Sequence, residues 1–419
     1  MSRFLLSAMP FTGHVGPMTV VARELVRRGH DVRVHTGSRF RDRVEASGAR
    51  LVPWREAPDF DENDLTATFP RLVGKKGMRQ LLVNVADCFI ATAPAQVTDL
   101  EAEWKSEPWE VLAADETSIG AVLFSEREGM PWATVCVLPL NLPGTAGPPS
   151  GMGIRPGTNA VTRARDAVLR GLVPVISRSL TKAIAQAQRG VGLTPDGRTM
   201  DRLVFSSTLI VASGSPLLDY DRADRPPHLR FIGSFGIPSA STALPGWWGD
   251  LEGRRVVLVT QGTQNIDPDD LIRPALEALE GRDVIAVATT GVAGRDSLPF
   301  PVPANARVAG FLPFADLLPK VDAAITNGGW GSTLAALSDS VPLIVAGGDL
   351  DKPEVAARVA WSGAGVNLRT GTPRSAAVAA AVDRVLAEAS FRDAASRVAA
   401  QLHSLGGAGR AAELLEGAR

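Results

Sequence analysis

Short apolar runs rich in valine, leucine and isoleucine alternate with stretches of helical period along almost the whole chain. This alternation is typical of parallel sheets that helices cover on both faces. It predicts strands at Phe4–Met9, Asp31–His35, Arg50–Pro53, Glu110–Ala114, Trp132–Val137, Arg255–Thr260, Val284–Ala288, Ala306–Ala309, Ala323–Thr326 and Leu343–Ala346. It predicts helices at Val15–Arg28, Ser118–Glu128, Asp269–Leu279, Ser332–Ser338, Glu354–Trp361 and Ser375–Leu386. Because the pattern starts twice, we expect an α/β protein with two Rossmann-like, doubly wound domains that face a central cleft.

A segment rich in proline and glycine separates the two halves. Residues Gly233–Gly253 include Pro238 and Pro245 and several Gly and Ser residues, a composition that resists regular structure. The chain has 419 residues, more than the ~100–200 residues of one ordinary domain. We therefore expect an N-terminal domain of residues 1–232, a linker of residues 233–253 and a C-terminal domain of residues 254–390.

The composition of the chain narrows the classes of binding partner and the cellular compartments that we expect. The 44 basic and 45 acidic residues leave a net charge of −1, which gives no electrostatic reason to expect nucleic acid. The longest apolar runs, such as Val256–Thr260 and Val341–Ala346, fall far short of the ~20 residues that span a bilayer. The N-terminus lacks the features of a secretory signal, so we expect a cytoplasmic protein without integral membrane association. Cys88 and Cys136 alone can build neither a disulfide framework nor a thiolate metal site.

The strongest local motif is a glycine-rich turn between a strand and a helix. Residues Ala323–Thr326 are apolar, and Asn327-Gly328-Gly329-Trp330-Gly331-Ser332-Thr333 follows them. Backbone N–H groups and the dipole at a helix N-terminus favour a phosphate, and the hydroxyls of Ser332 and Thr333 could add hydrogen bonds. A tight turn capped by Ser332 with no ligand is the alternative. The motif is neither a Walker loop nor a complete G-x-G-x-x-G site, so a nucleotide without nicotinamide fits best.

A second post-strand loop lies near this turn in the predicted sheet. Asp351 and Lys352 follow the strand at Leu343–Ala346 and precede a helix, so they should sit at the same edge. A carboxylate next to an ammonium could hydrogen-bond sugar hydroxyls, whereas helix capping by Asp351 is the structural alternative. Asp349 and Asp351 also form a D-x-D pair, but such pairs recur by chance in this chain, and we expect no metal.

A histidine occupies the corresponding edge of the first predicted sheet. His14 lies between the first strand and the first helix, and its imidazole could accept a hydroxyl proton near neutral pH. Asp115 ends a strand at the same edge, where a carboxylate could fix the tautomer of the ring. A structural histidine, and helix capping by Asp115, remain the alternatives. The proline- and glycine-rich segment Pro139–Pro156 is either a surface connection or one wall of an apolar pocket.

Several motifs together resemble the family-1 glycosyltransferases of the GT-B fold, especially bacterial enzymes that decorate macrolides, polyketides and other lipophilic natural products. The likeness spans nearly the whole chain and lies in the order and spacing of five segments: Gly13-His14-Val15-Gly16-Pro17, Gln261-Gly262-Thr263, Phe311-Leu312-Pro313-Phe314, Asn327–Thr333 and Asp351-Lys352. It implies a final helical stretch in residues 391–419 that crosses back onto the first domain.

The resemblance also implies roles for individual residues. His14 would be the general base and Asp115 its orienting carboxylate, and Phe311 would stack on the nucleobase of a nucleotide diphosphate sugar. The implied donor-binding residues are Gly262, Thr263, Phe311, Leu312, Asn327, Gly328, Gly329, Gly331, Ser332, Thr333, Asp351 and Lys352. The implied reaction is an inverting, metal-independent transfer to a hydroxyl of a hydrophobic acceptor, which would lie near Pro139–Pro156 and Asp61–Met78, in a monomer or homodimer.

Four departures from the family pattern affect the donor. Asn327 replaces a histidine that contacts the α-phosphate, and Ala335 replaces a glutamate that grips the ribose hydroxyls. Lys352 replaces a glutamine, and Phe314 stands where a polar residue is common. Loss of that glutamate matters less for a deoxyribose, so we expect a thymidine rather than a uridine diphosphate sugar. A nucleotide-sugar epimerase of the same architecture and an inactive helper protein are the alternatives to a transferase.

Overall fold

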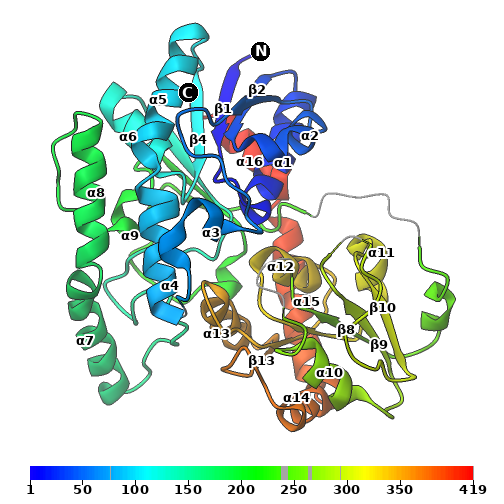
Figure 1. Ribbon diagram of the computed structural model, residues 1–419. Helices are drawn as coiled ribbons and strands as arrows, with labels where there is room; N and C mark the ends of the chain where they lie inside the picture. The colour runs from blue at the N-terminus through cyan, green and yellow to red at the C-terminus, as the bar shows by residue number, and fades with distance from the viewer. Residues whose placement is uncertain (76, 237–243, 263–266, 293, 419) are drawn as a thin grey trace.

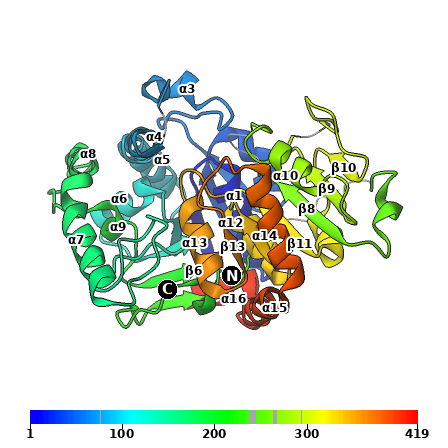
Figure 2. The same ribbon diagram turned by 90° about the horizontal axis from the view of Figure 1, so that it is seen from below.

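A computed structural model describes the chain except residues 76, 237–243, 263–266, 293 and 419. It contains two lobes, each built around a parallel sheet, as the two figures show (Figures 1 and 2). The first sheet has the order β3-β2-β1-β4-β5-β6-β7 and the second the order β10-β9-β8-β11-β12-β13. The predicted α/β class with two doubly wound sheets is confirmed.

The strands alternate with helices in chain order. The first sheet contains β1 (Arg3–Ser7), β2 (Asp31–Thr36), β3 (Arg50–Pro53), β4 (Val111–Asp115), β5 (Trp132–Cys136), β6 (Leu209–Ala212) and β7 (Leu229–Phe231). The second contains β8 (Val256–Thr260), β9 (Ile285–Thr289), β10 (Ala306–Ala309), β11 (Ala323–Thr326), β12 (Leu343–Val345) and β13 (Gly365–Asn367). The strands β6, β7 and β13 were not predicted, and β7 and β13 have only three residues each.

The helices of the first half are α1 (Thr12–Arg27), α2 (Arg41–Glu45), α3 (Leu65–Thr68), α4 (Gly77–Asn84), α5 (Ala93–Ser106), α6 (Ile119–Glu128), α7 (Ala160–Ile176), α8 (Arg178–Gly190) and α9 (Met200–Leu203). Those of the second half are α10 (Ile272–Leu279), α11 (Phe314–Leu317), α12 (Trp330–Ser338), α13 (Lys352–Ser362), α14 (Ser375–Ala387), α15 (Ala389–Ser404) and α16 (Gly407–Glu416). The helix predicted from Asp269 begins three residues later, at Ile272.

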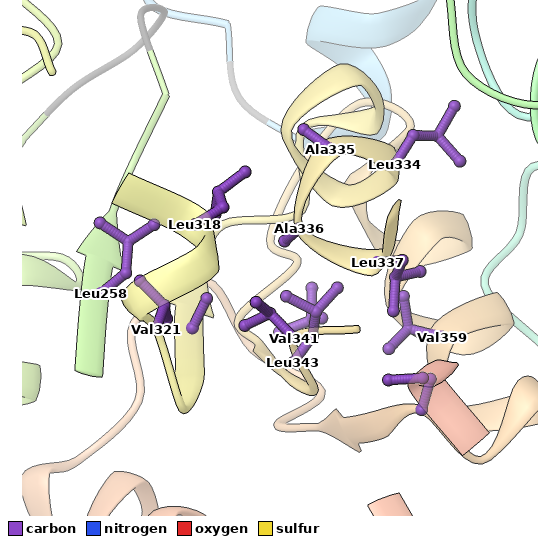
Figure 3. Close-up of a cluster of buried hydrophobic side chains, with 14 of the residues drawn as sticks. Leu258, Leu318, Val321, Leu334, Ala335, Ala336, Leu337, Val341, Leu343 and Val359 are labelled. Atoms are coloured by element: carbon purple, nitrogen blue, oxygen red, sulfur yellow. The ribbon is translucent and has the colours of Figure 1, made fainter. Parts of the chain in front are cut away.

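Both sheets have apolar residues on both faces, as expected for parallel strands with crossover helices. In β1, Phe4 and Leu6 pack with α1 and α16, whereas Leu5 packs on the other face with α5 and α6. In β8, Leu258 belongs to a cluster with α12 and α13, and Val259 faces α10 and α14. Figure 3 shows part of the Leu258 cluster, in which Ala335 and Ala336 of α12 lie above Val341 and Leu343.

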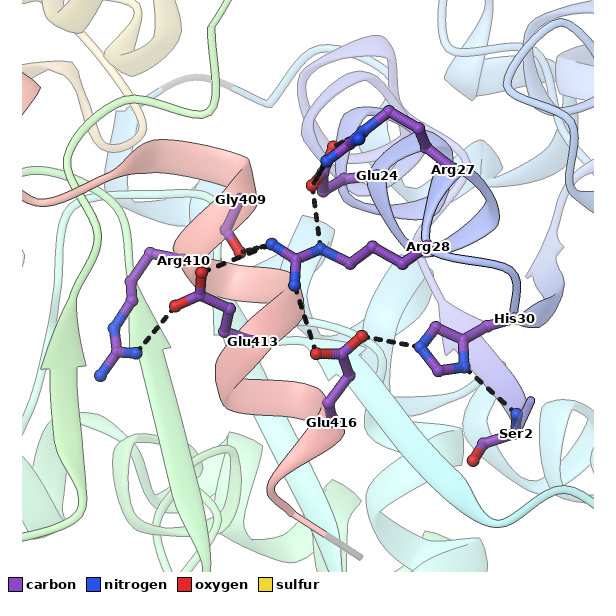
Figure 4. Close-up of polar contacts among 9 residues, drawn as sticks. All are labelled: Ser2, Glu24, Arg27, Arg28, His30, Gly409, Arg410, Glu413 and Glu416. Carbon is purple, nitrogen blue, oxygen red and sulfur yellow. Dashed lines mark hydrogen bonds and ion pairs between the residues drawn. The ribbon is translucent and has the colours of Figure 1, made fainter.

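The last two helices connect the lobes. Buried residues of α15 belong to the core of the second lobe, and those of α16 belong to the core of the first. At the docking site of α16, the Arg28 guanidinium donates to Glu24, to the Gly409 carbonyl oxygen and to Glu416 (Figure 4). Glu416 also lies 2.7 Å from His30 Nε2. The chain therefore leaves the second lobe through α15 and ends on the first.

The segment proposed as the linker, residues 233–253, is only partly described. It begins at Gly233, which forms an isolated bridge with Gly214, and it contains the short 3₁₀ helix η5 (Trp248–Leu251). Pro238 lies outside the described residues. The domain boundaries stay predictions.

Among the described residues, one helix is long and predominantly apolar. The nearly continuous helix Arg79–Ser106, formed by α4, the π-helical turn η3 (Val85–Ile90) and α5, could cross a membrane by length and composition alone. Polar residues interrupt its sequence, so it contains no long uninterrupted apolar run. Val97 and Leu100 lie in the core of the first lobe. Because core helices of soluble proteins pass the same test, this is weak evidence for a membrane segment.

The docking of α16 can be tested with two neighbouring substitutions. Leu415 is fully buried in the core of the first lobe, so Leu415→Ala should lower the free energy of unfolding by ~2–5 kcal/mol. Glu416→Gln removes a partly exposed ion pair and should cost less than ~1 kcal/mol. Urea denaturation of both variants measures the difference. Equal losses would contradict the assignment of α16 to the core of the first lobe.

Candidate active site

His14 and Asp115 come together because β1 and β4 are neighbours. His14 lies in the first turn of α1, directly after β1, and Asp115 is the last residue of β4. The Nδ1 atom of His14 is 3.3 Å from Asp115 Oδ2 and 3.1 Å from the hydroxyl of Thr117. Both His14 and Asp115 are buried. The predicted pair therefore exists as a direct contact.

The Asp115 carboxylate is held by several donors. The Met9 N–H donates to Oδ2 at 2.7 Å, and the N–H and the hydroxyl of Thr117 donate to Oδ1, each at 2.6 Å. Burial alone would raise the pKa of Asp115, but His14 and these donors lower it. Asp115 is thus an ionised group in a fixed position, rather than the capping residue of the alternative interpretation.

The environment of His14 favours its protonated form. Burial opposes the charge, but Asp115, with smaller contributions from Glu116 and Asp351, outweighs it and raises the pKa of His14 above 6.5. The contribution of Asp351 is informative because this residue belongs to the second lobe. The two lobes therefore bring His14 and Asp351 within electrostatic reach of each other across the site.

Glu116 and Thr117 are two site residues that sequence reasoning missed. Glu116 is buried, and its carboxylate accepts from the N–H groups of Val137 at 3.0 Å and Leu138 at 2.8 Å. Burial and the neighbouring Asp115 raise the pKa of Glu116 to about 7. The signal was available, since an apolar strand followed by the polar run Asp115–Ser118 indicates a post-strand site.

The glycine-rich turn leads into α12 with Gly329 at the N-cap position. The first N–H that donates within the helix is that of Thr333, to the Gly329 carbonyl oxygen at 2.9 Å. The preceding N–H groups of Trp330, Gly331 and Ser332 are therefore available for a ligand. Gly331 is exposed and Ser332 is half-buried. The Ser332 hydroxyl donates back to the Gly329 carbonyl oxygen at 2.9 Å, which places Ser332 inside the first turn and not at the cap expected in the ligand-free alternative.

Two side chains of this turn, those of Asn327 and Thr333, are buried. The side-chain amide of Asn327 donates to the Gln261 carbonyl oxygen, and its Oδ1 accepts from the Gly329 N–H at 3.4 Å. Thr333 is fully buried beneath the turn. The binding roles of both residues stay predictions. Asn327 ties the loop after β8 to the loop after β11.

Close packing places the turn against the start of α13. Gly328 has φ +91°, and a Cβ there would lie 2.9 Å from Val345 Cγ1 and 3.3 Å from the Lys352 carbonyl oxygen. Only glycine satisfies both constraints without strain. Because Thr326 of β11 pairs with Val345 of β12, Asp351 and Lys352 lie beside the turn as predicted from the strand order.

The side chains of Asp351 and Lys352 have different environments. Lys352 Nζ donates to Asp349 Oδ1 at 2.8 Å. Asp351 occupies the N-cap position of α13, yet its side chain makes no capping bond to the described residues. Burial raises the pKa of Asp351, and Lys352 and His14 oppose this shift. Among the described residues there is no cluster of three or more His, Cys, Asp or Glu side chains that could hold a metal ion.

The remaining predicted donor residues lie along the same sheet edge. Phe311 follows β10 and is 47% exposed, which leaves its ring available for stacking, whereas the Leu312 side chain is buried in the core. Gly262 follows β8, and a Cβ on it would lie 3.5 Å from the Asn327 amide nitrogen. Thr263 lies outside the described residues. At ~4.8 Å between strands, the edge from β10 to β11 spans ~14 Å and suits an elongated ligand.

The turn also lies where the lobes meet. The Trp330 indole N–H donates to the Ser213 hydroxyl at 2.9 Å, and Ser213 follows β6 of the first lobe. Gly153, from the Pro139–Pro156 segment, donates its N–H to Glu354 of α13 at 2.9 Å. This segment therefore contacts the second lobe through Gly153, while Thr145, Ala146, Gly151 and Met152 are exposed.

Comparisons with known proteins agree with this arrangement. Residues 276–407 match the family described as the C-terminal domain of erythromycin biosynthesis protein CIII-like proteins. The chain is 40% identical, over 99% of both proteins, to 4'-demethylrebeccamycin synthase of Lentzea aerocolonigenes. The chain belongs to the family-1 glycosyltransferases of natural-product biosynthesis. This glycosyltransferase is also 32% identical to UDP-glucosyltransferase B1 of Starmerella bombicola, over 94% of the chain and 93% of the relative.

Solved structures support the fold. A glycosyltransferase of kitacinnamycin superposes with a TM-score of 0.75 at 21% identity, over 100% of this chain and 99% of that one. The glycosyltransferase VinC in complex with dTDP superposes with a TM-score of 0.69 at 20% identity, over 99% of both chains. The predicted GT-B fold is confirmed, and neither an epimerase nor an inactive helper protein is favoured.

The electrostatics of His14 can be measured directly. Since Asp115 supplies the main attraction that overcomes burial, Asp115→Asn should lower the pKa of His14 relative to the wild type. NMR titration of the imidazole C–H signals, assigned with His14→Ala, follows this shift among only five histidines. A pKa below 6.5 in the wild type, or one that rises in Asp115→Asn, would contradict the role given to Asp115.

Proposed function

We propose that this glycosyltransferase moves a sugar from a thymidine diphosphate donor to a hydroxyl group of a lipophilic natural product, with inversion at the anomeric carbon. The observation that carries the proposal is the opposition of two groups across the lobes. His14 and Asp115 follow the carboxyl ends of β1 and β4 in the first sheet, and the available amides of α12 follow β11 in the second. Next to these amides, Trp330 donates to Ser213 of the first lobe at 2.9 Å. A base and an anion-binding helix start would thus act on the same donor in our proposal.

His14 has the features of a general base. Its Nδ1 side is engaged by Asp115 and Thr117, so a proton from the acceptor hydroxyl would go to Nε2. The new positive charge would be offset by the buried Asp115 carboxylate. The acceptor oxygen then attacks the anomeric carbon from the side of the first lobe while the diphosphate leaves toward the second. Attack and departure on opposite faces invert the configuration.

The leaving group is stabilised by the start of α12. The N–H groups of Trp330, Gly331 and Ser332 and the helix dipole would meet the negative charge that develops on the diphosphate. Removal of single preorganised donors in other enzymes costs ~3–4 kcal/mol of transition-state stabilisation. Because the Asn327 side-chain amide bonds to Gln261, backbone groups carry most of this role in our proposal.

The acceptor would lie against aromatic side chains of the first lobe. The ring of Phe11 is half-buried, and its centroid is 5.7 Å from that of His14, 5.2 Å from that of Phe60 and 5.9 Å from that of Phe89. Such a group of rings next to the base favours a planar, apolar acceptor. Phe60 immediately precedes the predicted acceptor segment Asp61–Met78, whereas Phe11 and Phe89 were not anticipated.

The thymidine preference rests on Ala335. This side chain is 6% exposed and packs in the core cluster, so position 335 supplies no acceptor for ribose hydroxyls. VinC, a fold relative, was solved with dTDP, whereas the fungal relative is named a UDP-glucosyltransferase. We also propose a cytoplasmic enzyme without integral membrane association, as a monomer or homodimer.

The role of the base predicts a specific kinetic defect. His14→Ala should lower the rate of transfer by ~10²–10⁴-fold, as for loss of a general base, with the Kd for dTDP unchanged. In the wild type, kcat/KM should rise with pH as His14 loses its proton, with an apparent pKa above 6.5. His403→Ala, an exposed position, is the control. Unchanged turnover in His14→Ala would remove this residue from the mechanism.

The donor prediction is tested with a matched panel. The dTDP and UDP forms of glucose and rhamnose are incubated with hydrophobic aglycones, including the substrate of the relative 4'-demethylrebeccamycin synthase, and new adduct masses are recorded. We expect higher kcat/KM with the dTDP donor of each pair. A clear preference for the UDP donors would reject the thymidine assignment while leaving the transferase assignment in place.

A further inference from the structure

Three buried charged side chains join the lobes away from the reacting groups. The side chains of Arg358, Glu354 and Asp219 are each 1% exposed. Arg358 and Glu354 belong to α13 of the second lobe, and Asp219 follows the first-lobe strand β6. Arg358 Nε donates to Glu354 Oε1 at 2.9 Å, and Nη1 donates to Asp219 Oδ1 at 3.0 Å. One guanidinium thus binds a carboxylate from each side.

The same network holds the Pro139–Pro156 segment near both of its ends. Arg358 Nη2 donates to the Leu140 carbonyl oxygen at 2.7 Å. The Gly153 N–H donates to Glu354 Oε2 at 2.9 Å. Between them, Arg222 donates to the Leu142 carbonyl oxygen at 2.9 Å and to Asp219 at 3.3 Å. A segment of low intrinsic order is therefore fixed by buried charges.

Gly153 allows this segment to touch the start of α13. Its φ is +65°, and a Cβ at this position would lie 2.8 Å from the Pro353 carbonyl oxygen. Pro353 follows Asp351 and Lys352 directly, so the segment contacts the helix turn that presents these two residues. The contact places a first-lobe loop beside the predicted sugar-binding pair.

We propose that Arg358 and Glu354 are positioning residues that set the Pro139–Pro156 segment against Asp351 and Lys352, so that the acceptor side and the sugar side of the site are assembled together. This inference rests on the proposed function, since it assigns the segment to the acceptor. A guanidinium suits the task because its planar fork reaches both carboxylates and a carbonyl oxygen at once. A lysine ammonium at this position cannot make the three contacts in the same geometry.

The other charged and aromatic groups around Arg358 support a fixed arrangement. Arg225 donates to Asp219 Oδ2 at 3.3 Å, and the guanidinium carbon of Arg358 is 5.1 Å from the centroid of the Tyr220 ring. Tyr220 in turn packs edge-to-face on Trp361 of α13. The buried carboxylates and guanidinium compensate one another, and removal of one would leave an unpaired charge in the interface.

Two substitutions disturb the contact by different routes. Arg358→Lys keeps the charge but loses the fork, and Gly153→Ala introduces a clash without altering any charge. Gly151→Ala is the matched control, because Gly151 has a similar φ of +84° with no atom within 4 Å of a built Cβ. All three are compared with the wild type using the fastest-converted aglycone of the panel above, with folding checked by circular dichroism.

We expect Arg358→Lys and Gly153→Ala to raise the acceptor KM and to lower kcat/KM for the acceptor by ~10–100-fold, because a misplacement of the acceptor by about 1 Å has an effect of this size. Both substitutions should also increase hydrolysis of the donor relative to transfer. The Kd for dTDP should stay within about twofold of the wild type, and Gly151→Ala should behave like the wild type. Unchanged acceptor kinetics in a folded Gly153→Ala protein, or equal loss of dTDP binding, would overturn the proposal.

Amide hydrogen exchange tests the contact between the Pro139–Pro156 segment and α13 independently of the proposed function. In the unliganded protein, amides of residues 140–153 should exchange faster in Arg358→Lys and Gly153→Ala than in the wild type and in Gly151→Ala. If the wild type binds dTDP but transfers no sugar, the function fails while this exchange pattern still tests the contact. Equal exchange in all four proteins would show that the network does not hold the segment.

Discussion

The active site depends on the parallel pairing of every strand in both sheets. Parallel pairing brings all carboxyl ends of a sheet to one edge, so residues far apart in sequence become neighbours there. The contact of His14 with Asp115 follows from the pairing of β1 with β4. The packing of Gly328 on Lys352 follows from the pairing of β11 with β12. The arrangement of both lobes then places these two edges opposite each other.

The strand positions and the paired His14 and Asp115 could be predicted because hydrophobic periodicity and post-strand loops are local signals. Arg50–Pro53, Ala306–Ala309 and Ala323–Thr326 match the structure residue for residue. The short strand Leu229–Phe231 was missed because it contains three residues in a proline-rich stretch and owes its existence to pairing with β6. Tertiary contacts, rather than propensity, define such strands.

The directions of the side chains in the candidate site could not be predicted from the sequence. Asn327 and Thr333 belong to the predicted phosphate turn, in which the Asn327 side chain bonds to Gln261 and Thr333 is buried. Glu116 follows Asp115 in sequence, but its role depends on the N–H groups of Val137 and Leu138, which belong to the loop after β5. These contacts join separate post-strand loops, and no spacing rule in one sequence specifies them.

The charges of the site differ between the two lobes. Burial opposes a charge on His14, but the neighbouring Asp115 carboxylate, with smaller contributions from Glu116 and Asp351, raises its pKa. These groups favour an imidazolium, the state that His14 would reach in the proposed mechanism, and they would disfavour a diphosphate placed near the base. The amides of α12 offer the favourable anion site one strand away from Asp351. The donor would therefore orient with its phosphates on the second sheet and its anomeric carbon toward His14, so the charge distribution and the strand order select the same direction for the transferred sugar.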